Sequence, residues 1–166
     1  MRILGLDPGS RATGYGIVES RGGRLLPCCF GTIVPPRGLD LLARLPHITR
    51  SIESLVAREK PDVAAVEDIF LARNTRVALQ LGHVRGAALL PLLRAGTPVR
   101  AYPARAVKKA VTGYGAAEKE QVQRMVRLLL GLRVEPLTLD ASDALAVAIC
   151  HAHSDTFLQL RAAPGA

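Results

Sequence analysis

Four acidic residues stand where a carboxylate could take part in catalysis. Asp7 ends a short apolar stretch near the N-terminus, and Glu67 ends the apolar run 64–66. Asp140 and Asp143 are three residues apart at the start of the last predicted helix, so their side chains share one face. An unpaired ionised carboxylate at the end of a buried strand is costly, so a cation or a hydrogen-bond donor must accompany it. Together the four would form a cage of oxygen ligands suited to Mg²⁺ or Mn²⁺, and a pair of such ions could assist phosphodiester cleavage.

Each of these acids also has an ordinary structural explanation. Asp7 precedes Pro8 and Gly9 and could simply begin a turn. Asp140 and Asp143 could stabilise the start of a helix, because aspartate favours the cap and the first turn. No single acid decides between the alternatives. The metal-site hypothesis depends on the convergence of two strand ends and one helix start.

The pattern of apolar residues predicts the elements that would bring these acids together. Short apolar runs bounded by turn residues predict strands at residues 2–6, 14–20, 29–34, 63–66 and 99–102. Helices are predicted at residues 39–60, 76–94, 104–111, 117–130 and 141–157. The first has apolar residues at helical spacing, and Pro46 is expected to interrupt or kink it. Three hairpin-linked strands followed by alternating helices and strands predict an α/β fold, with a mixed five-stranded sheet flanked by helices. Residues 1–158 are expected to form one domain, and residues 159–166 a flexible tail.

The composition and charge limit the classes of molecule that the protein is expected to bind. The formal charge of +8 and the isoelectric point near 10.1 favour a polyanion such as nucleic acid or an acidic membrane surface. The most apolar segment, residues 77–93, includes Gly82, Arg85 and Pro91 and does not predict a membrane span. The three cysteines form no metal-binding pair and no convincing disulfide framework, which fits a reducing compartment. We therefore expect a cytoplasmic protein with no membrane partner.

Several segments resemble, in order, the motifs of the RuvC family of Holliday-junction resolvases. They are residues 7–16 (DPGSRATGYG), 66–70 (VEDIF), 81–86 (LGHVRG), 115–119 (GAAEK) and 140–144 (DASDA). Motifs in matching order and at matching separations are more specific than any one of them. The resemblance implies an RNase H-like fold, a homodimer, and paired symmetric nicks in four-way DNA junctions during recombination and repair.

The same resemblance carries catalytic and metal-binding roles onto Asp7, Glu67, Asp140 and Asp143. It implies dependence on Mg²⁺, with Mn²⁺ able to substitute and two ions per active site, and delivery by a branch-migration motor formed by RuvA and RuvB. Many members of the family have glutamine where this chain has Asp68. That additional acid either perturbs the site or faces solvent, and we expect the second.

DNA contacts are also implied by the resemblance. The DNA-binding candidates are Phe70, Arg73, Asn74, Arg76, Lys108 and Lys119. Phe70 could stack on or wedge between bases, or it could fold back onto the core. Lys119 is also expected to be catalytic, because its counterpart in the family faces the scissile phosphate. Weaker candidates for backbone contacts are Arg105, Lys109 and Arg124.

Two further patterns concern helix faces. Lys119, Gln123 and Arg127 recur every four residues, which by itself is typical of a solvated face. The predicted helix at residues 76–94 is apolar around most of its girth, so it must be buried on two sides, one against the sheet and one against a second copy. A charge at Leu89 or Ala87 is expected to break that dimer.

Two other functions stay open on the residues alone, and a third does not fit the length of the chain. An RNase H-like nuclease acting on RNA or RNA–DNA hybrids would use the same acids. A DNA-binding module would need them only structurally. An actin-like kinase shares the opening hairpin pattern, but needs a second lobe for which 166 residues are too few.

His151 and His153 are two apart on a helix and point in different directions, so they are not expected to form a metal pair.

Overall fold

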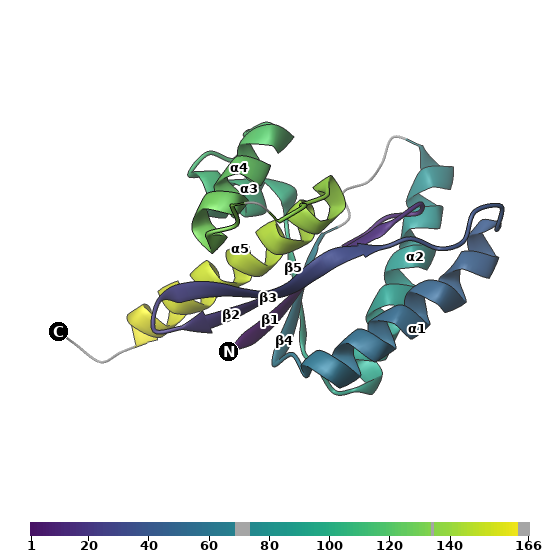
Figure 1. Cartoon of the computed structure of the whole chain (residues 1–166), viewed down its shortest axis with the longest axis horizontal. Coiled ribbons are helices and arrows are strands. Elements are labelled where there is room, and N and C mark those ends of the chain that lie inside the picture. The colour runs from purple at the N-terminus through teal and green to yellow at the C-terminus, as the bar shows by residue number, and fades with distance from the viewer. Residues whose placement is uncertain (69–73, 134, 163–166) are drawn as a thin grey trace.

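A five-stranded sheet forms the centre of the molecule (Figure 1). The computed structural model describes residues 1–68, 74–133 and 135–162, and of residues 155–162 it describes the backbone only. The strands are β1 (Arg2–Pro8), β2 (Thr13–Arg21), β3 (Arg24–Ile33), β4 (Val63–Glu67) and β5 (Val99–Tyr102), in the order β3-β2-β1-β4-β5. β1 and β2 pair antiparallel, as do β2 and β3, whereas β4 runs parallel to β1 and to β5. The predicted mixed sheet is confirmed.

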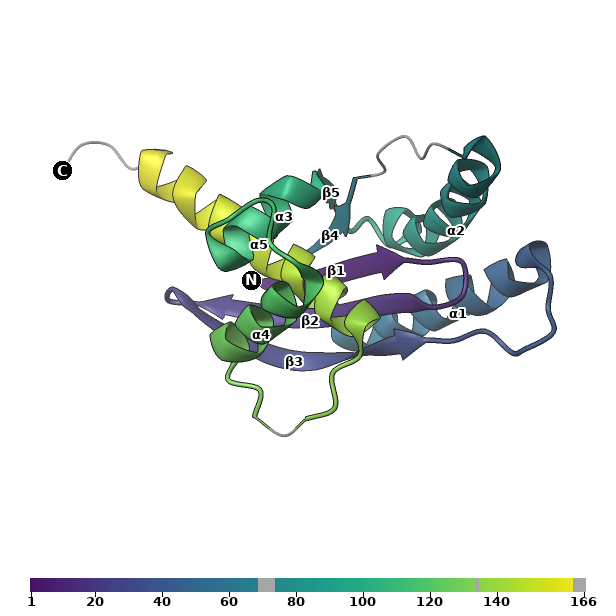
Figure 2. The same ribbon diagram turned by 90° about the horizontal axis from the view of Figure 1, so that it is seen from above.

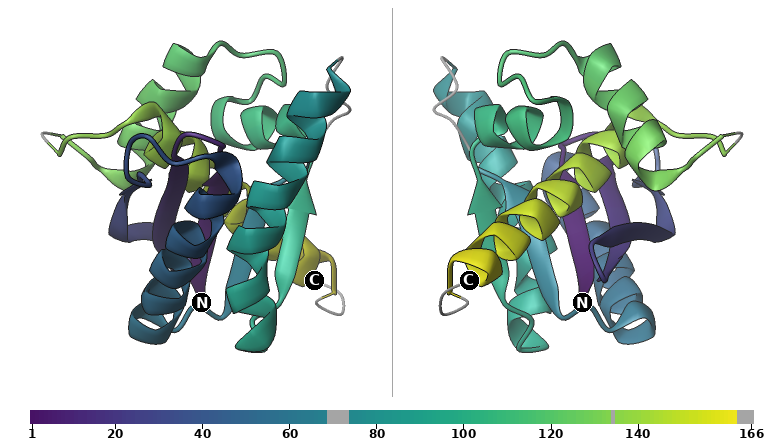
Figure 3. Two further views of the ribbon diagram at one scale, coloured as in Figure 1. Left: turned by 90° about the vertical axis from the view of Figure 1, so that its right-hand side faces the viewer. Right: turned by 90° about the vertical axis from the view of Figure 1, so that its left-hand side faces the viewer.

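Helices cover both faces of this sheet (Figures 2 and 3). The helices are α1 (Leu41–Glu59), α2 (Thr75–Arg94), α3 (Ala104–Thr112), α4 (Lys119–Leu130) and α5 (Leu139–Ala162). α1 and α2 cover one face, and α5, flanked by α3 and α4, crosses the other. Because side chains alternate along a strand, Leu4 and Leu6 pack toward α1 and α2, whereas Ile3 packs toward α5. The sheet therefore separates two apolar cores.

Several element boundaries differ from the sequence prediction. β3 begins at Arg24 rather than at residue 29, because Gly22 and Gly23 adopt positive φ and close a tight hairpin. α1 begins after Asp40, whose carboxylate accepts the amide of Ala43, and it continues through Pro46 without ending there. α5 runs to Ala162, beyond the predicted end at residue 157.

Close contact between α5 and the sheet depends on glycines in β1 and β2. A β-carbon at Gly14 would collide with the backbone carbonyl of Asp140, and one at Gly5 would collide with that of Ala144. α5 therefore lies against the strand backbones at a distance that no other residue type permits. This contact fixes where the N-terminal end of α5 meets the sheet.

No helix in the described part of the chain is both long enough and apolar enough to cross a membrane.

Candidate active site

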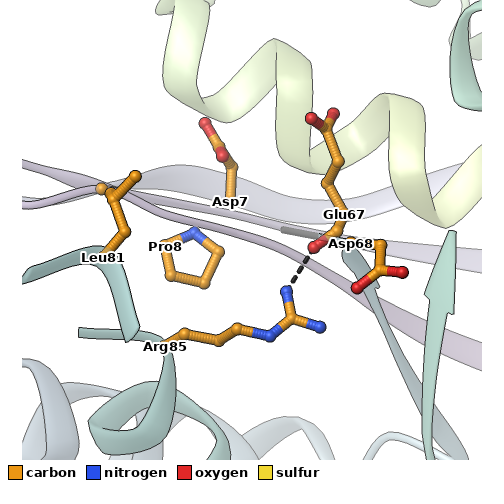
Figure 4. Close-up of a pocket in the computed structure, with 7 residues that line it drawn as sticks. Asp7, Pro8, Glu67, Asp68, Leu81 and Arg85 are labelled. Carbon is orange, nitrogen blue, oxygen red and sulfur yellow. Dashed lines mark hydrogen bonds between the residues drawn. The ribbon is translucent and has the colours of Figure 1, made fainter. Parts of the chain in front are cut away.

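The ends of two parallel strands place the first two acids side by side. Leu6 of β1 is in register with Val66 of β4, so the next residues, Asp7 and Glu67, lie at the same edge of the sheet. Both residues belong to the face that α5 covers, and Figure 4 shows both carboxylates pointing toward that helix. Asp7 and Glu67 are half-buried. The predicted convergence of the two strand ends is therefore present in the fold.

The first two turns of α5 carry the other two acids toward this edge. The helix is capped by Thr138, whose hydroxyl accepts the amide of Ala141 at 3.2 Å and lies 2.7 Å from the hydroxyl of Thr32 on β3. The close approach at Gly14, the partner of Asp7 in the β1–β2 ladder, places the backbone of Asp140 over that pair. Asp140 thus begins its helix beside Asp7, and Asp143 follows one turn later.

The loop before α5 is held by the face of α4 that contains Lys119. Gln123 donates to the carbonyl of Leu137 at 3.0 Å, and Arg127 donates to the carbonyl of Glu135 at 3.1 Å. This face is therefore more than the solvated face that the spacing alone would suggest, because these side chains hold the connection that leads to Asp140. The spacing of four residues indicated that these side chains share one helix face, but it could not indicate what that face contacts.

Burial, together with repulsion between the carboxylates, changes the ionisation of two of the four acids. Burial, followed by the charges of Asp143, Glu67 and Asp140, raises the pKa of Asp7 to about 7, against a small opposing effect of Lys119. Burial and then Asp143 also raise the pKa of Glu67. The site therefore holds more negative charge than its own cations neutralise, which is the situation that a divalent cation relieves.

Two lysines face these acids from α3 and α4. The Nζ atom of Lys119 lies 3.2 Å from Oδ2 of Asp143, and the pKa of Lys119 is raised, chiefly by the charge of that carboxylate. Lys108, Lys119 and Asp143 line one pocket of about 320 Å³ together with Asp7 and Glu67. The prediction that both lysines lie at the site agrees with this arrangement.

A second pocket lies on the other side of the two strand ends, next to α2. Its volume is about 360 Å³, and its lining residues are Asp7, Pro8, Gly9, Glu67, Asp68, Leu81 and Arg85. Figure 4 shows this pocket, with the side chain of Arg85 extending under the end of β4. Asp7 and Glu67 therefore border both pockets, one that contains Lys108 and Lys119 on the α3–α4 side and one that contains Arg85 on the α2 side.

The donor set fits a hard divalent cation, although the side chains are not gathered around one point. Among residues 1–68, 74–133 and 135–162, no three histidine, cysteine, aspartate or glutamate side chains are close enough together to hold a metal ion as they stand. Asp143 is instead paired with Lys119. Four carboxylates and no sulfur or imidazole are nevertheless the ligand chemistry of Mg²⁺ or Mn²⁺.

The other predicted DNA-binding residues have mixed outcomes. Phe70 and Arg73 lie outside the described residues. Asn74 caps α2, because its side-chain oxygen accepts the amides of Arg76 at 3.0 Å and Val77 at 3.3 Å. These bonds give Asn74 a structural role that the family resemblance did not indicate. Arg76 is exposed in the first turn of α2.

Asp68 and the histidines behave as expected from the sequence. Asp68 is exposed, although it also borders the pocket beside α2. The ring of His151 lies 2.6 Å from the hydroxyl of Tyr102, whereas that of His153 lies 3.1 Å from the carbonyl of Ala110. The two rings therefore have different partners and form no metal pair.

Sequence reasoning assigned no role to Arg85. The available signal was a single arginine inside the apolar segment 77–93, where a buried charge requires a partner. In the fold its Nη1 donates to the carbonyl oxygen of Glu67.

A family model, relatives in sequence and a solved structure all indicate the same family. Residues 3–151 match the family model for crossover junction endodeoxyribonuclease RuvC. A crossover junction endodeoxyribonuclease RuvC of Citrifermentans bemidjiense is 51% identical over 154 residues, which are 93% of each chain. That of Syntrophomonas wolfei is 49% identical over 93% of this chain and 90% of the relative. A solved structure, T. thermophilus RuvC in complex with Holliday junction substrate, has a TM-score of 0.87 and 33% identity, covering 95% of this chain and 96% of the other.

Proposed function

Because the chain belongs to the RuvC family of crossover junction endodeoxyribonucleases, we propose that it resolves four-way DNA junctions by paired, symmetric nicks in recombination and repair. One observation supports this most directly: Asp7, Glu67 and the first turn of α5 meet at one edge of the sheet, facing two lysines. Asp7 and Glu67 also border a pocket on either side of the strand ends, so a substrate could reach them. The net charge of +8 favours the approach of DNA.

Each side chain then has a defined task in phosphodiester cleavage. Asp7, Glu67, Asp140 and Asp143 are the proposed metal ligands, and two Mg²⁺ ions, with Mn²⁺ as a substitute, are the proposed cofactors. When bound, such ions supply charge stabilisation for both the attacking and the leaving oxygen. Lys119 and Lys108 offset the negative charge that develops on the scissile phosphate from the α3–α4 side. Lys119 contacts only Oδ2 of Asp143, so Oδ1 of that carboxylate would remain available to a cation.

We also propose a homodimer formed through α2. Its exposed apolar residues, Leu79, Leu90 and Leu93, are 64%, 49% and 61% exposed. Gly82 and Gly86 recur at helical spacing between Leu79 and Leu90, and there is open space where their β-carbons would be. The buried side of α2 faces the sheet, so this exposed stripe is available to a second α2. A two-fold dimer matches the symmetry of a four-way junction and would place one active site on each of two strands.

Further DNA contacts are proposed for Arg76, which is exposed on α2, and for the weaker candidate Lys109, which is exposed on α3. Phe70 and Arg73 stay predictions of the family resemblance, as does a branch-migration motor formed by RuvA and RuvB. The proposed compartment is the cytoplasm, because the proposed substrate arises on bacterial chromosomes.

The test is a cleavage assay on a mobile four-way junction with mapped nicks. Wild-type protein with Mg²⁺ should nick opposing strands symmetrically, while Asp7→Asn and Glu67→Gln should bind the junction and fail to cut it. Linear duplex and an RNA–DNA hybrid are tested under the same conditions. Preferential cutting of the hybrid would identify the rival RNase H-like activity, and binding without any metal-dependent cutting would identify a DNA-binding module.

A further inference from the structure

Arg85 is held against the end of the strand that carries Glu67 (Figure 4). Its Nη1 donates a hydrogen bond to the carbonyl oxygen of Glu67. Glu67 is the last residue of β4 and lies one position beyond Val66, where pairing with β1 stops. A half-buried carbonyl at the end of a ladder needs a donor from elsewhere. Arg85 supplies that donor from α2.

The surroundings of the guanidinium fit a fixed position. Arg85 is half-buried; burial lowers its pKa, and the charge of Asp68 acts in the opposite direction. An arginine keeps its charge in such a place, and its planar group loses little freedom for each bond that it forms. The guanidinium therefore interacts with two consecutive residues, through the carbonyl of Glu67 and the charge of Asp68.

The end of β4 is thus held from two directions. On the β5 side, the amide of Asp68 donates to the carbonyl of Tyr102 at 2.8 Å. On the α2 side, Arg85 binds the carbonyl of the preceding residue. The Glu67 carboxylate points the other way, toward α5 (Figure 4), so Arg85 can act on it only through the backbone.

We propose that Arg85 is a positioning residue for the nuclease reaction, which holds the end of β4 so that the Glu67 carboxylate faces Asp7 and the first turn of α5. The inference rests on the proposed function, but the bond it concerns belongs to the protein alone. A loss of geometry at a metal-ligand position slows catalysis far more than it weakens the binding of an extended substrate. A contact between Arg85 and a DNA phosphate would do the opposite.

The experiment compares Arg85→Gln and Arg85→Lys with Arg94→Gln. Arg94 is a matched control, because it lies on the same helix, is exposed, and interacts only loosely with Glu53, at 3.8 Å. Arg85→Gln and Arg94→Gln remove the same charge. Three quantities are measured: kcat on saturating junction, Kd for the junction without divalent metal, and amide hydrogen exchange of residues 63–68 in the protein without metal or DNA.

For Arg85→Gln we expect kcat to fall by about tenfold or more, Kd to change less than about threefold, and the Asp68 amide to exchange faster. Arg85→Lys, which keeps one donor and the charge, should recover part of both losses, and Arg94→Gln should show neither. Unchanged kcat and exchange in Arg85→Gln, or a loss confined to Kd, would overturn the proposal. If Arg85→Gln does not fold, Arg85→Lys decides alone, since a positioning role requires an intermediate kcat at unchanged Kd.

The exchange measurement separates this inference from the function itself. If the wild-type protein cut no junction, the proposed function would fail, yet faster exchange at Asp68 in Arg85→Gln would still support the clamp on β4. If the wild-type protein cut junctions and neither exchange nor kcat depended on Arg85, only the positioning role would fail.

Discussion

Lys119 and Asp143 form an ion pair at the mouth of the site, with Nζ 3.2 Å from Oδ2. The lysine is the first residue of α4, and the aspartate lies in the second turn of α5, so the pair joins two helices above the strand ends. The ammonium group of Lys119 thus lies beside carboxylates whose own charges repel one another. The same lysine faces the pocket in which a phosphate would lie.

Lys119→Ala should therefore slow cleavage more than it weakens binding. A cation beside the scissile phosphate acts mainly on the charge that develops in the transition state, so kcat should fall about tenfold or more. Single-turnover cleavage and equilibrium binding of the junction measure the two effects. Arg50→Ala is the control, because Arg50 is exposed on α1, on the other face of the sheet, and does not line the pocket. A rise in Kd with unchanged kcat would contradict the assignment.

Asp7 should make the metal-free protein less stable as the pH rises. Its pKa in the folded protein, about 7, exceeds the ordinary value of 3.8. Stability is therefore greatest below about pH 4 for this group and is lost as the pH rises through about 7, by on the order of 4 kcal/mol at most. Asp7→Asn should remove much of this dependence and raise the stability of the metal-free protein at pH 8.

Denaturant unfolding of wild type and Asp7→Asn between pH 5 and pH 8 measures that difference. Saturating Mg²⁺ should stabilise the wild type at pH 8 and stabilise Asp7→Asn much less, because a ligand that binds only the folded state raises its stability. Parallel pH profiles for the two proteins would show that Asp7 is not the titrating group.

Gly14→Ala should disturb the site through packing alone. The added β-carbon would meet the backbone carbonyl of Asp140, and backbone cannot move aside as a flexible side chain can. We expect a loss of about 1–3 kcal/mol in unfolding free energy and a larger relative loss of cleavage, since Asp140 and Asp143 move with α5. Gly31→Ala on β3 is the control, because the atoms nearest to its β-carbon would be those at the far end of the Tyr15 side chain, which can move. Equal effects of both substitutions would argue against a special contact at Gly14.

Charges on the exposed stripe of α2 should separate the proposed dimer. Leu90→Asp and Leu93→Asp are expected to sediment as monomers at micromolar concentration. Each variant should still unfold thermally in one cooperative transition, as a folded protein does. Leu128→Asp on α4 is the control, because Leu128 is 73% exposed and far along the chain from α2. A wild-type monomer that still makes paired nicks would contradict the dimer.

The structure changes the choice of residues for that experiment. Leu89 packs against the core under α2, and the carbonyl of Ala87 accepts a hydrogen bond from Thr49 on α1. Both residues are only partly exposed. A charge at Leu89 would therefore disturb the core as well as the proposed dimer, so Leu90 and Leu93 give a cleaner test.

The sequence by itself determined which acids stand at ends of elements. Alternating apolar residues and turn signals defined the strands that end in Asp7 and Glu67, since those patterns are local. The helix that begins with Asp140 and Asp143 followed from the same local rules. The mixed sheet followed from the order of the strands and helices, because few topologies satisfy a given order.

Only the tertiary structure decided what these elements contact. No local pattern indicates that Gly14 makes room for the backbone of Asp140, or that Gln123 holds the loop before α5, because both contacts join residues far apart in the chain. Arg85 is the clearest case. Its charge within an apolar helix was a signal that sequence reasoning did not use. The partner is a backbone carbonyl, and carbonyls are the same at every residue of the sequence. Which one receives the guanidinium depends on how α2 packs beside β4.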